Sequence, residues 1–370
     1  MKPEWKTTPS GKLRGKGLGL PFEGTSGPFN AITDVAGVSV GYATIIEGDG
    51  ALKQGVGPVR TGVTAIVPRP LEQIDQPLFA GFFSLNGNGD LSGTHYIEET
   101  GKFALPITIT NTHSCGITRD ATIKWAVELL AERYYDDFAL PVAAETYDGF
   151  LNDINGFHVE ARHVVEAIDA AQGGAIEEGS IGGGTGMKCF GFKAGSGTAS
   201  RLVGYKGEEF TVGVFVQANF GTQRHLTVLG QNIGADPDLP QMLTNTRDTD
   251  LSSIIAVIAT DAPFLPHQLK RLARRASFGI GKTGGMATHG SGDLFLAFTT
   301  AASDLGPGAI RTVRFVPDED IDPFFEAVVQ ATEEAILNSM FANEAMTGRD
   351  GNFVPALPHQ VVKKALGLKG

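Results

Sequence analysis

Short hydrophobic runs alternate with glycine-rich polar turns over the first third of the chain. Val, Ile, Thr and aromatic residues dominate these runs, and this composition and length are typical of β-strands. The pattern predicts strands over residues 37–46, 62–70, 78–90 and 105–114, and later in the chain over 202–207, 210–221, 254–259, 293–300 and 311–316.

Longer segments carry apolar residues three and four positions apart, which is the spacing of an amphipathic helix. The first is expected from about residue 119 to residue 133, with apolar positions at Ile123, Ala126, Val127 and Leu130. Further helices are expected over 157–172, 262–281, 320–343 and 355–367. The segment 320–343 is the longest and combines an apolar stripe with an acidic face.

Strand and helix signals are mixed along the whole chain rather than gathered in separate blocks. No Pro/Ser-rich linker divides the 370 residues, and no internal repeat is visible. This order predicts a single domain, residues 1–370, of layered α/β or α+β architecture in which helices cover sheets.

The charge balance is acidic, with 41 Asp and Glu against 30 Lys and Arg and a formal net charge of −11. This balance, without any basic cluster, disfavours nucleic acid as a partner. The start, MKPEWKTTPSGKLRGKG, has no apolar core, and no run of about 18 apolar residues occurs, so we expect neither a signal peptide nor a membrane partner. The expected location is the cytoplasm.

Motifs for metal or cofactor chemistry are lacking. The eight histidines form no H-E-x-x-H and no paired spacing with Cys or Asp. Cys115 and Cys189 lie far apart without a CxxC spacing, so we expect reduced core thiols. The glycine-rich stretch SIGGGTGMK, Ser180 to Lys188, lacks the ending of a P-loop, which favours a turn near a substrate site over a nucleotide site. No cofactor and no metal are expected.

The stretch DTDLSSIIAVIATDAPFLPHQ, residues 248–268, places two serines at the threshold of a dense β run, after the polar, turn-like residues 245–250. This is either an ordinary loop–strand junction or a bond that the chain cleaves itself. No G-x-S-x-G elbow with a separate histidine base is present, so a serine nucleophile needs another base. Cleavage between Ser252 and Ser253 would supply one, because the new α-amine has a pKa near 8, about that of any chain terminus, and lies within reach of its own Oγ.

Several stretches together resemble one known family, the self-processing L-aminopeptidase D-amidase/D-esterases and β-peptidyl aminopeptidases. They run in the family's order over nearly the whole chain, which makes the set far more specific than any one motif. They are GPFNAITDVAGVSVG, RTGVTAI, LNGNGD, ITNTHS, ETYDGFLNDI, GGGTGM, VQANFG, SSIIAVIATDAPFLPHQ, SGDLFLAF and TEEAILNSM.

The resemblance implies cleavage between Ser252 and Ser253 into a large subunit, 1–252, and a small subunit, 253–370. It implies a four-layer αββα sandwich like that of N-terminal-nucleophile hydrolases but differently connected, shared with ornithine acetyltransferase. It also implies small peptide, amide or ester substrates and a homo-oligomer, a tetramer of cleaved heterodimers.

The resemblance also assigns the catalytic residues, with Ser253 as the nucleophile that forms the acyl-enzyme. Ser291 and Asp293 match the pair that orients this serine and its amine, and their other interpretation is a turn before a strand. Asn219 matches the oxyanion-hole asparagine, and its other interpretation is a turn residue.

Two further residues would bind the substrate. Glu145 matches the carboxylate that holds the free amino group, and Tyr147 matches a tyrosine that lines the same site. Both could instead cap or pack a helix. The stretch LNGNGD, Leu85 to Asp90, is interpreted as a hairpin turn outside the site.

One position departs from the family pattern, since Ser252 stands where Gly or Asn precedes the scissile bond. Its hydroxyl makes it a second candidate nucleophile. Two other functions stay open, an acyltransferase of the ornithine acetyltransferase type, which uses Thr at the position of Ser253, and an uncleaved binding protein on the same fold.

Overall fold

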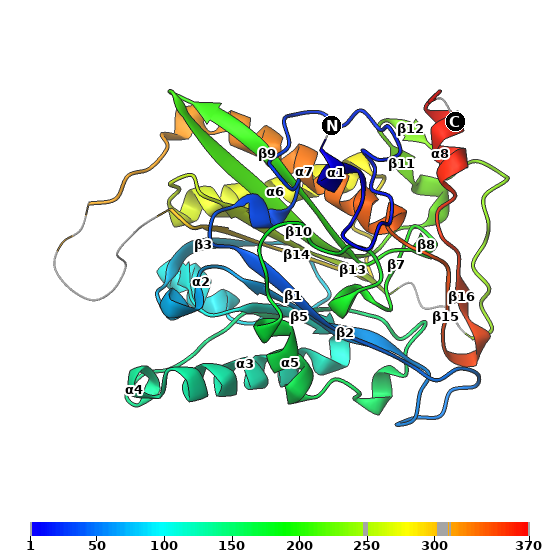
Figure 1. Cartoon of the computed structure of the whole chain (residues 1–370), viewed down its shortest axis with the longest axis horizontal. Helices are drawn as coiled ribbons and strands as arrows, with labels where there is room; N and C mark the ends of the chain where they lie inside the picture. Colours follow the sequence, from blue (N-terminus) through cyan, green and yellow to red (C-terminus); the bar gives the residue numbers. More distant parts are fainter. Residues whose placement is uncertain (1, 247–250, 302–309, 311, 369–370) are drawn as a thin grey trace.

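The elements of the molecule stack in four layers, helix–sheet–sheet–helix, which Figure 1 shows edge-on. This computed structural model describes residues 2–246, 251–301, 310 and 312–368. The four-layer αββα sandwich expected from the resemblance is confirmed.

The larger sheet has six strands in the order β4–β3–β14–β13–β10–β9. Their bounds are β3 (Leu78–Gly87), β4 (Lys102–Phe103), β9 (Ser196–Tyr205), β10 (Glu208–Asn219), β13 (Ser252–Thr260) and β14 (Ser291–Thr299). Only β13 and β14 run parallel, and the other neighbours in this sheet are antiparallel. Strands from before and after the 252–253 junction therefore share hydrogen bonds within one sheet.

The smaller sheet has four strands in the order β1–β2–β5–β6. Its members are β1 (Ser39–Glu47), β2 (Val59–Val67), β5 (Ile107–Asn111) and β6 (Ala143–Thr146). The sequence pattern missed β6, because four residues are too few to show an alternation. This strand pairs in parallel with β5 and carries Glu145 opposite Thr110.

Two pairs of longer helices cover the outer faces of the sheets. The helices α3 (Cys115–Leu129) and α5 (Ala161–Asp169) pack on the smaller sheet, and α6 (Pro266–Lys282) and α7 (Asp322–Phe341) pack on the larger one. The remaining helices and strands are short: α1 (Pro3–Lys6), α2 (Thr94–Thr100), α4 (Ala131–Tyr134), α8 (His359–Ala365), β7 (Lys188–Cys189), β8 (Phe192–Lys193), β11 (Thr227–Val228), β12 (Gln231–Asn232), β15 (Met346–Thr347) and β16 (Phe353–Val354).

The central strand β13 is buried on both faces, which explains its unbroken hydrophobic run. Ile254, Ala256 and Ile258 contribute to the core under α6 and α7. Ile255 and Val257 contribute to the core between the two sheets. Because side chains alternate along a strand, Ser253 shares the face of Ile255 and points toward the smaller sheet.

Three expectations about elements need correction. Residues 312–316 form no strand, because only Val316 is buried and the bond from its N–H to Pro263 O does not extend into a ladder. The helix expected over 119–133 begins at Cys115 and breaks at Leu130. The acidic residues of α7 do not form one exposed face, since Asp322 and Glu326 are exposed but Glu333 and Glu334 are buried.

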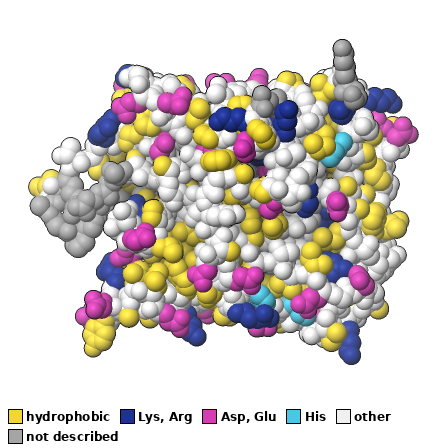
Figure 2. All heavy atoms as spheres, viewed as in Figure 1, with side chains coloured by type: hydrophobic (Ala, Val, Ile, Leu, Met, Phe, Trp, Pro, Cys, Tyr) yellow, Lys and Arg dark blue, Asp and Glu magenta, His cyan; other side chains and the backbone are white. Residues whose placement is uncertain are grey.

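The surface mixes charges of both signs. On the face shown in Figure 2, acidic and basic side chains are interspersed rather than gathered into one tract. Within the described ranges, no helix is long and apolar enough to cross a membrane. Cys115 and Cys189 are free, buried thiols, which confirms the expectation for both cysteines.

Candidate active site

Ser253 lies at the start of β13, between the ends of two neighbouring strands. In the register of the sheet it stands opposite Asn219 of β10 and opposite Gly292 of β14. It is buried, with 3% of its surface exposed. Two of the predicted site segments, VQANFG and SGDLFLAF, therefore lie on either side of the predicted nucleophile.

Ser291 and Asp293 form a hydrogen-bonded pair on β14, since the Ser291 hydroxyl donates to Asp293 Oδ1 at 2.6 Å. Burial raises the pKa of the Asp293 carboxyl to about 6, against hydrogen bonds from Ser291 and the Ile254 N–H that lower it. Asp293 Oδ2 is buried without a hydrogen-bond partner among the described residues. In register Asp293 stands beside Ile254, so its carboxyl lies closer to the backbone around Ser253 than to the face that carries the Ser253 side chain.

Asn219 ends β10 with its side-chain amide held at both ends. Its Oδ1 accepts from the Lys188 N–H at 3.1 Å, and its Nδ2 donates to Tyr147 O at 2.9 Å. The Lys188 N–H requires an oxygen on its side, which fixes the orientation of the amide. An amide nitrogen has two hydrogens, so one N–H remains after the bond to Tyr147. Asn219 is thus a strand residue with an oriented donor, not a turn residue.

Glu145 reaches the same region from the smaller sheet. Its side chain is buried, its Oε1 accepts from the Asp90 N–H at 2.9 Å, and its Oε2 accepts from the Thr112 hydroxyl. Burial raises the pKa of this carboxyl, the Thr112 and Asp90 N–H hydrogen bonds lower it, the charge of Asp90 raises it and His113 lowers it. Glu145 lies on a strand, so the interpretation as a helix cap is wrong.

Tyr147 follows two residues after Glu145, just beyond the end of β6. Its carbonyl contacts Asn219, as described above, and its ring lies over the following turn, where a Cβ on Gly149 would lie 2.4 Å from the Tyr147 hydroxyl. The segment thus connects the predicted amine-binding carboxylate with the predicted oxyanion donor, and Tyr147 also lies outside any helix.

The stretch Leu85 to Asp90 is no hairpin turn. It ends β3 and leads into the loop before α2, and it touches both sides of the site. Asn88 Nδ2 donates to Gly290 O at 2.7 Å, beside Ser291, and the Asp90 N–H binds Glu145. Sequence reasoning missed these residues because NGNGD is a strong turn signal. The helical pattern that follows it, rather than a second strand, was the available warning.

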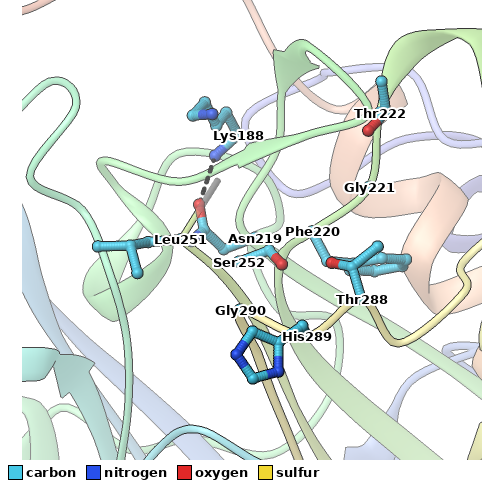
Figure 3. Close-up of a pocket in the computed structure, with 10 residues that line it drawn as sticks. All are labelled: Lys188, Asn219, Phe220, Gly221, Thr222, Leu251, Ser252, Thr288, His289 and Gly290. Carbon is cyan, nitrogen blue, oxygen red and sulfur yellow. Dashed lines mark hydrogen bonds between the residues drawn. The ribbon is translucent and has the colours of Figure 1, made fainter. Parts of the chain in front are cut away.

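A cavity of about 420 Å³ opens beside the junction, on the side of Ser252. Figure 3 shows its lining, which β7, the end of β10, the start of β13 and the 288–290 loop contribute: Lys188, Asn219, Phe220, Gly221, Thr222, Leu251, Ser252, Thr288, His289 and Gly290. Ser252 lies between this cavity and Ser253, and alternation turns its side chain to the opposite face of β13. Residues 247–250, part of the polar approach to the junction, lie outside the described residues.

The glycine-rich stretch Ser180 to Lys188 is not a phosphate cradle. The Gly182 and Gly183 N–H groups donate to the hydroxyls of Thr44 and Thr64, and the Gly184 N–H donates to Ile181 O. A Cβ on Gly183 would lie 2.4 Å from a backbone oxygen of β5. The glycines therefore allow close packing against the sheets. The stretch ends at Lys188, whose N–H contacts Asn219. Among the described side chains no group of three or more potential metal ligands gathers.

Comparisons with known proteins extend over the same residues. The model of peptidase family S58 matches residues 30–354. A β-peptidyl aminopeptidase of Sphingosinicella microcystinivorans is 47% identical over 367 residues, which covers 95% of this chain and 91% of that protein.

Two solved structures share the fold. An L-aminopeptidase D-Ala-esterase/amidase from Ochrobactrum anthropi, described as a variant of the Ntn hydrolase fold, has a TM-score of 0.88 and 46% identity and covers 96% of this chain and 98% of its own. A Burkholderia β-aminopeptidase has a TM-score of 0.86 and 44% identity, with 96% and 98% covered. The expected enzyme class, a serine-type N-terminal-nucleophile hydrolase, is confirmed, and the chain belongs to peptidase family S58.

Proposed function

We propose that this self-processing aminopeptidase and amidase cleaves itself between Ser252 and Ser253 and then uses Ser253 as its nucleophile. The observation that supports the proposal is the position of Ser253. It is buried between the ends of β10 and β14, with an oriented amide donor, Asn219, on one side and on the other a buried carboxyl, Asp293, of which one oxygen has no partner among the described residues.

The nucleophile for self-cleavage comes from the junction itself. Ser253 Oγ attacks the carbonyl carbon of Ser252 as the C–N bond breaks, which leaves an ester at Oγ and a free amine on Ser253. Water then hydrolyses the ester. The products are residues 1–252 and 253–370, and the shared six-stranded sheet holds them together.

Turnover repeats this chemistry on a substrate. The free amine of Ser253 accepts the proton of Oγ while Oγ attacks the substrate carbonyl, and the proton then goes to the leaving amine or alcohol as its bond to the carbonyl carbon breaks. Water then hydrolyses the ester on Oγ, which releases the acid and restores the hydroxyl. The remaining Asn219 N–H stabilises the oxyanion, a contribution of about 2.7–4 kcal/mol for one such donor. Asp293 Oδ2 accepts a hydrogen bond from the new amine. Release of the Ser252 end opens the cavity toward Ser253.

Substrate selection depends on Glu145. Its carboxylate pairs with the free ammonium of the substrate in a charge-assisted contact, and Tyr147 lines the same end of the site. Small peptides, amides or esters with a free amino group are therefore the substrates, and N-acetylated analogues should fail.

The alternatives to an aminopeptidase are not favoured. The ornithine acetyltransferase type uses Thr as nucleophile, and this chain has Ser253. An inactive binding protein would have no need of an oriented amide and an unpaired buried carboxyl. Ser252 is the weaker candidate nucleophile, since Ser253, and not Ser252, stands opposite Asn219 in the register of the sheet.

The oligomeric state and the cellular location are also part of the proposal. The cleaved protein would assemble as a homo-oligomer, a tetramer of heterodimers, which sedimentation or light scattering would measure. Two free, buried thiols suit a reducing compartment, which supports the cytoplasm. Fractionation of the producing cells would test this location.

Mass spectrometry of the denatured protein tests the cleavage. We expect two pieces, the smaller with the N-terminal sequence Ser-Ile-Ile-Ala. Ser253→Ala should stay intact and inactive, whereas Ser252→Ala should still process and turn over. An intact wild-type chain that hydrolyses substrate, or an active Ser253→Ala variant, would refute the N-terminal nucleophile.

Glu145→Gln tests the recognition of the amine. Loss of the charge should lower kcat/KM for L-alanine p-nitroanilide by about tenfold or more, on the order of 1.4 kcal/mol. Self-cleavage should proceed as in wild type, because the scissile peptide carries no ammonium. Equal wild-type rates on L-alanine and N-acetyl-alanine p-nitroanilides would show that the site does not select an amine.

A further inference from the structure

We infer that Gly89 determines specificity by setting the distance between the nucleophile and the amine-binding carboxylate. The inference rests on the proposed function, in which Ser253 attacks the carbonyl and Glu145 holds the amine. Gly89 lies in the segment 88–90, between the strand end that carries Gly292 and the side chain of Glu145.

Contacts on both sides of Gly89 are close. A Cβ built on it would lie 3.0 Å from Glu145 Oε1 and 3.3 Å from the Gly292 Cα. Gly292 is the register partner of Ser253. Gly89 alone therefore separates Gly292 from Glu145, the carboxylate predicted to bind the amine. A side-chain atom larger than hydrogen fits at Gly89 only if Glu145 or Gly292 moves.

The segment is also held in place at both ends. Asn88 Nδ2 donates to Gly290 O at 2.7 Å, and the Asp90 N–H donates to Glu145 Oε1 at 2.9 Å. From the other side, a Cβ on Gly292 would lie 2.5 Å from Asn88 O. The segment thus acts as a spacer with fixed contacts to β14 and to Glu145.

The length of this spacer matters for the class of substrate. The carbonyl of an α-amino acid and that of a β-amino acid lie one carbon apart relative to the amine, a difference of about 1.5 Å per bond. A site that fixes both the carbonyl and the amine therefore discriminates between the two classes by distance. A displacement of about 1 Å near the chemistry can change rates by about 100-fold.

Gly89→Ala is the direct test. The added methyl should push the Glu145 carboxylate away from Gly292 by a few tenths of an ångström and so favour the longer substrate. We expect the ratio of kcat/KM for β-alanine p-nitroanilide to that for L-alanine p-nitroanilide to rise about threefold to tenfold. The Gly89 backbone is not in the left-handed region, so alanine adds no backbone strain there.

Gly87→Ala is the matched control in the same stretch. Its Cβ would have only Ser84 Oγ near it, at 3.6 Å, which is an ordinary contact, and its backbone also lies outside the left-handed region. The substrate ratio of this variant should stay within about twofold of wild type. Melting temperature and self-cleavage should be compared for both variants, to separate misfolding from a change in specificity.

Glu145→Asp provides a second route should Gly89→Ala not fold. It withdraws the carboxylate toward β6 without touching the spacer, so the ratio should move in the same direction while kcat/KM falls for both substrates. A folded Gly89→Ala enzyme with the wild-type ratio would overturn the inference and leave the aminopeptidase standing. A wild type that hydrolyses neither substrate nor any other aminoacyl anilide would overturn both.

Discussion

Two groups of buried carboxylates differ in their partners, one beneath the N-terminal segment and one at the ends of the central strands. In the first region each has a guanidinium partner. Glu178 lies 2.5 Å from Arg14 Nε, and Glu334 lies 2.8 Å from Arg201 Nη2, with all four side chains at most 4% exposed. Hydrogen bonds to backbone carbonyls satisfy further guanidinium N–H groups.

At the strand ends the buried carboxylates meet neutral donors instead. Glu145 accepts from a hydroxyl and a backbone N–H, and Asp293 accepts from the Ser291 hydroxyl. Neither forms an ion pair within the part of the chain that the structure describes. Burial raises the pKa of both carboxyls, as it does that of Glu178, so the distinguishing feature is the lack of a guanidinium partner.

Between these two groups, the difference in partners matches a difference in role. A buried carboxylate that already has a cation contributes to packing the N-terminal segment against α7 and β9. A buried carboxylate without one is costly unless a cation arrives, and the proposed reaction supplies two of them, the ammonium of the substrate at Glu145 and the new amine of Ser253 at Asp293.

The largest expected effect concerns stability in the first region. Glu334→Gln should lower the free energy of unfolding by about 3–5 kcal/mol, because it leaves the Arg201 guanidinium buried without its counter-charge. The measurement is urea unfolding in the Ser253→Ala background, which keeps the chain in one piece.

The control for this prediction is an exposed pair. Glu208 and Arg314 lie 2.9 Å apart with 55% and 77% of their side chains exposed, so Glu208→Gln should cost about 1 kcal/mol or less. Equal losses of stability in the two variants would mean that burial does not distinguish these ion pairs. The structural role assigned to the buried pairs of the first region would then be wrong.

Asp293→Asn should show the opposite pattern, a loss of activity without a loss of stability. The amide cannot accept a hydrogen bond from the Ser253 amine with the strength of a carboxylate, and kcat/KM should fall by about 100-fold or more. No cation is left behind, so the free energy of unfolding should not decrease. A destabilisation as large as that of Glu334→Gln would show that Asp293 has a structural partner after all.

The pH dependence of stability sharpens the same contrast. The pKa of Asp293 is about 6 in the folded chain, above the value of an unfolded Asp, so the folded state binds the proton more tightly. Its contribution is fully present below the unfolded pKa and is lost as the pH rises toward about 6. In the Ser253→Ala background, Asp293→Asn should therefore gain stability relative to its parent between about pH 4 and pH 6. A flat difference for Asp293→Asn would place the pKa of Asp293 near the ordinary value.

The sequence predicted most of the sheet and the site for different reasons. Strand β13 is a long hydrophobic run, and the register of β10, β13 and β14 then brings Asn219, Ser253 and Asp293 to one end of the sheet. The buried face of α7 was not predictable, because Glu334 is charged and only the distant Arg201 explains its burial. The spacing of apolar residues along a helix carries no information about a partner that is distant in the sequence.

The segment 88–90 shows a second reason why the sequence-based prediction was wrong. A local turn signal in NGNGD predicted a hairpin, and the tertiary contacts of Asn88 and Asp90 made it a connection between two sides of the site. Glu145 is similar, since its four-residue strand carries no readable pattern, and only the resemblance to a family identified it. Long-range contacts decide these positions, and propensity describes only neighbours in sequence.

The smallest expected effect is that of Ser291→Ala, which tests how far the Ser291 hydroxyl controls the pKa of Asp293. The Ser291 hydroxyl donates to Asp293 at 2.6 Å and lowers its pKa, so removal of this donor should raise the pKa further above about 6. Less of the carboxylate is then ionised near neutrality, and kcat/KM should fall by about tenfold at about pH 6.5 but recover at about pH 8.5. Ser291→Thr keeps the hydroxyl and should retain the wild-type profile. A loss in Ser291→Ala that is equal at both pH values would mean that the hydroxyl acts on the substrate directly, and not through the charge of Asp293.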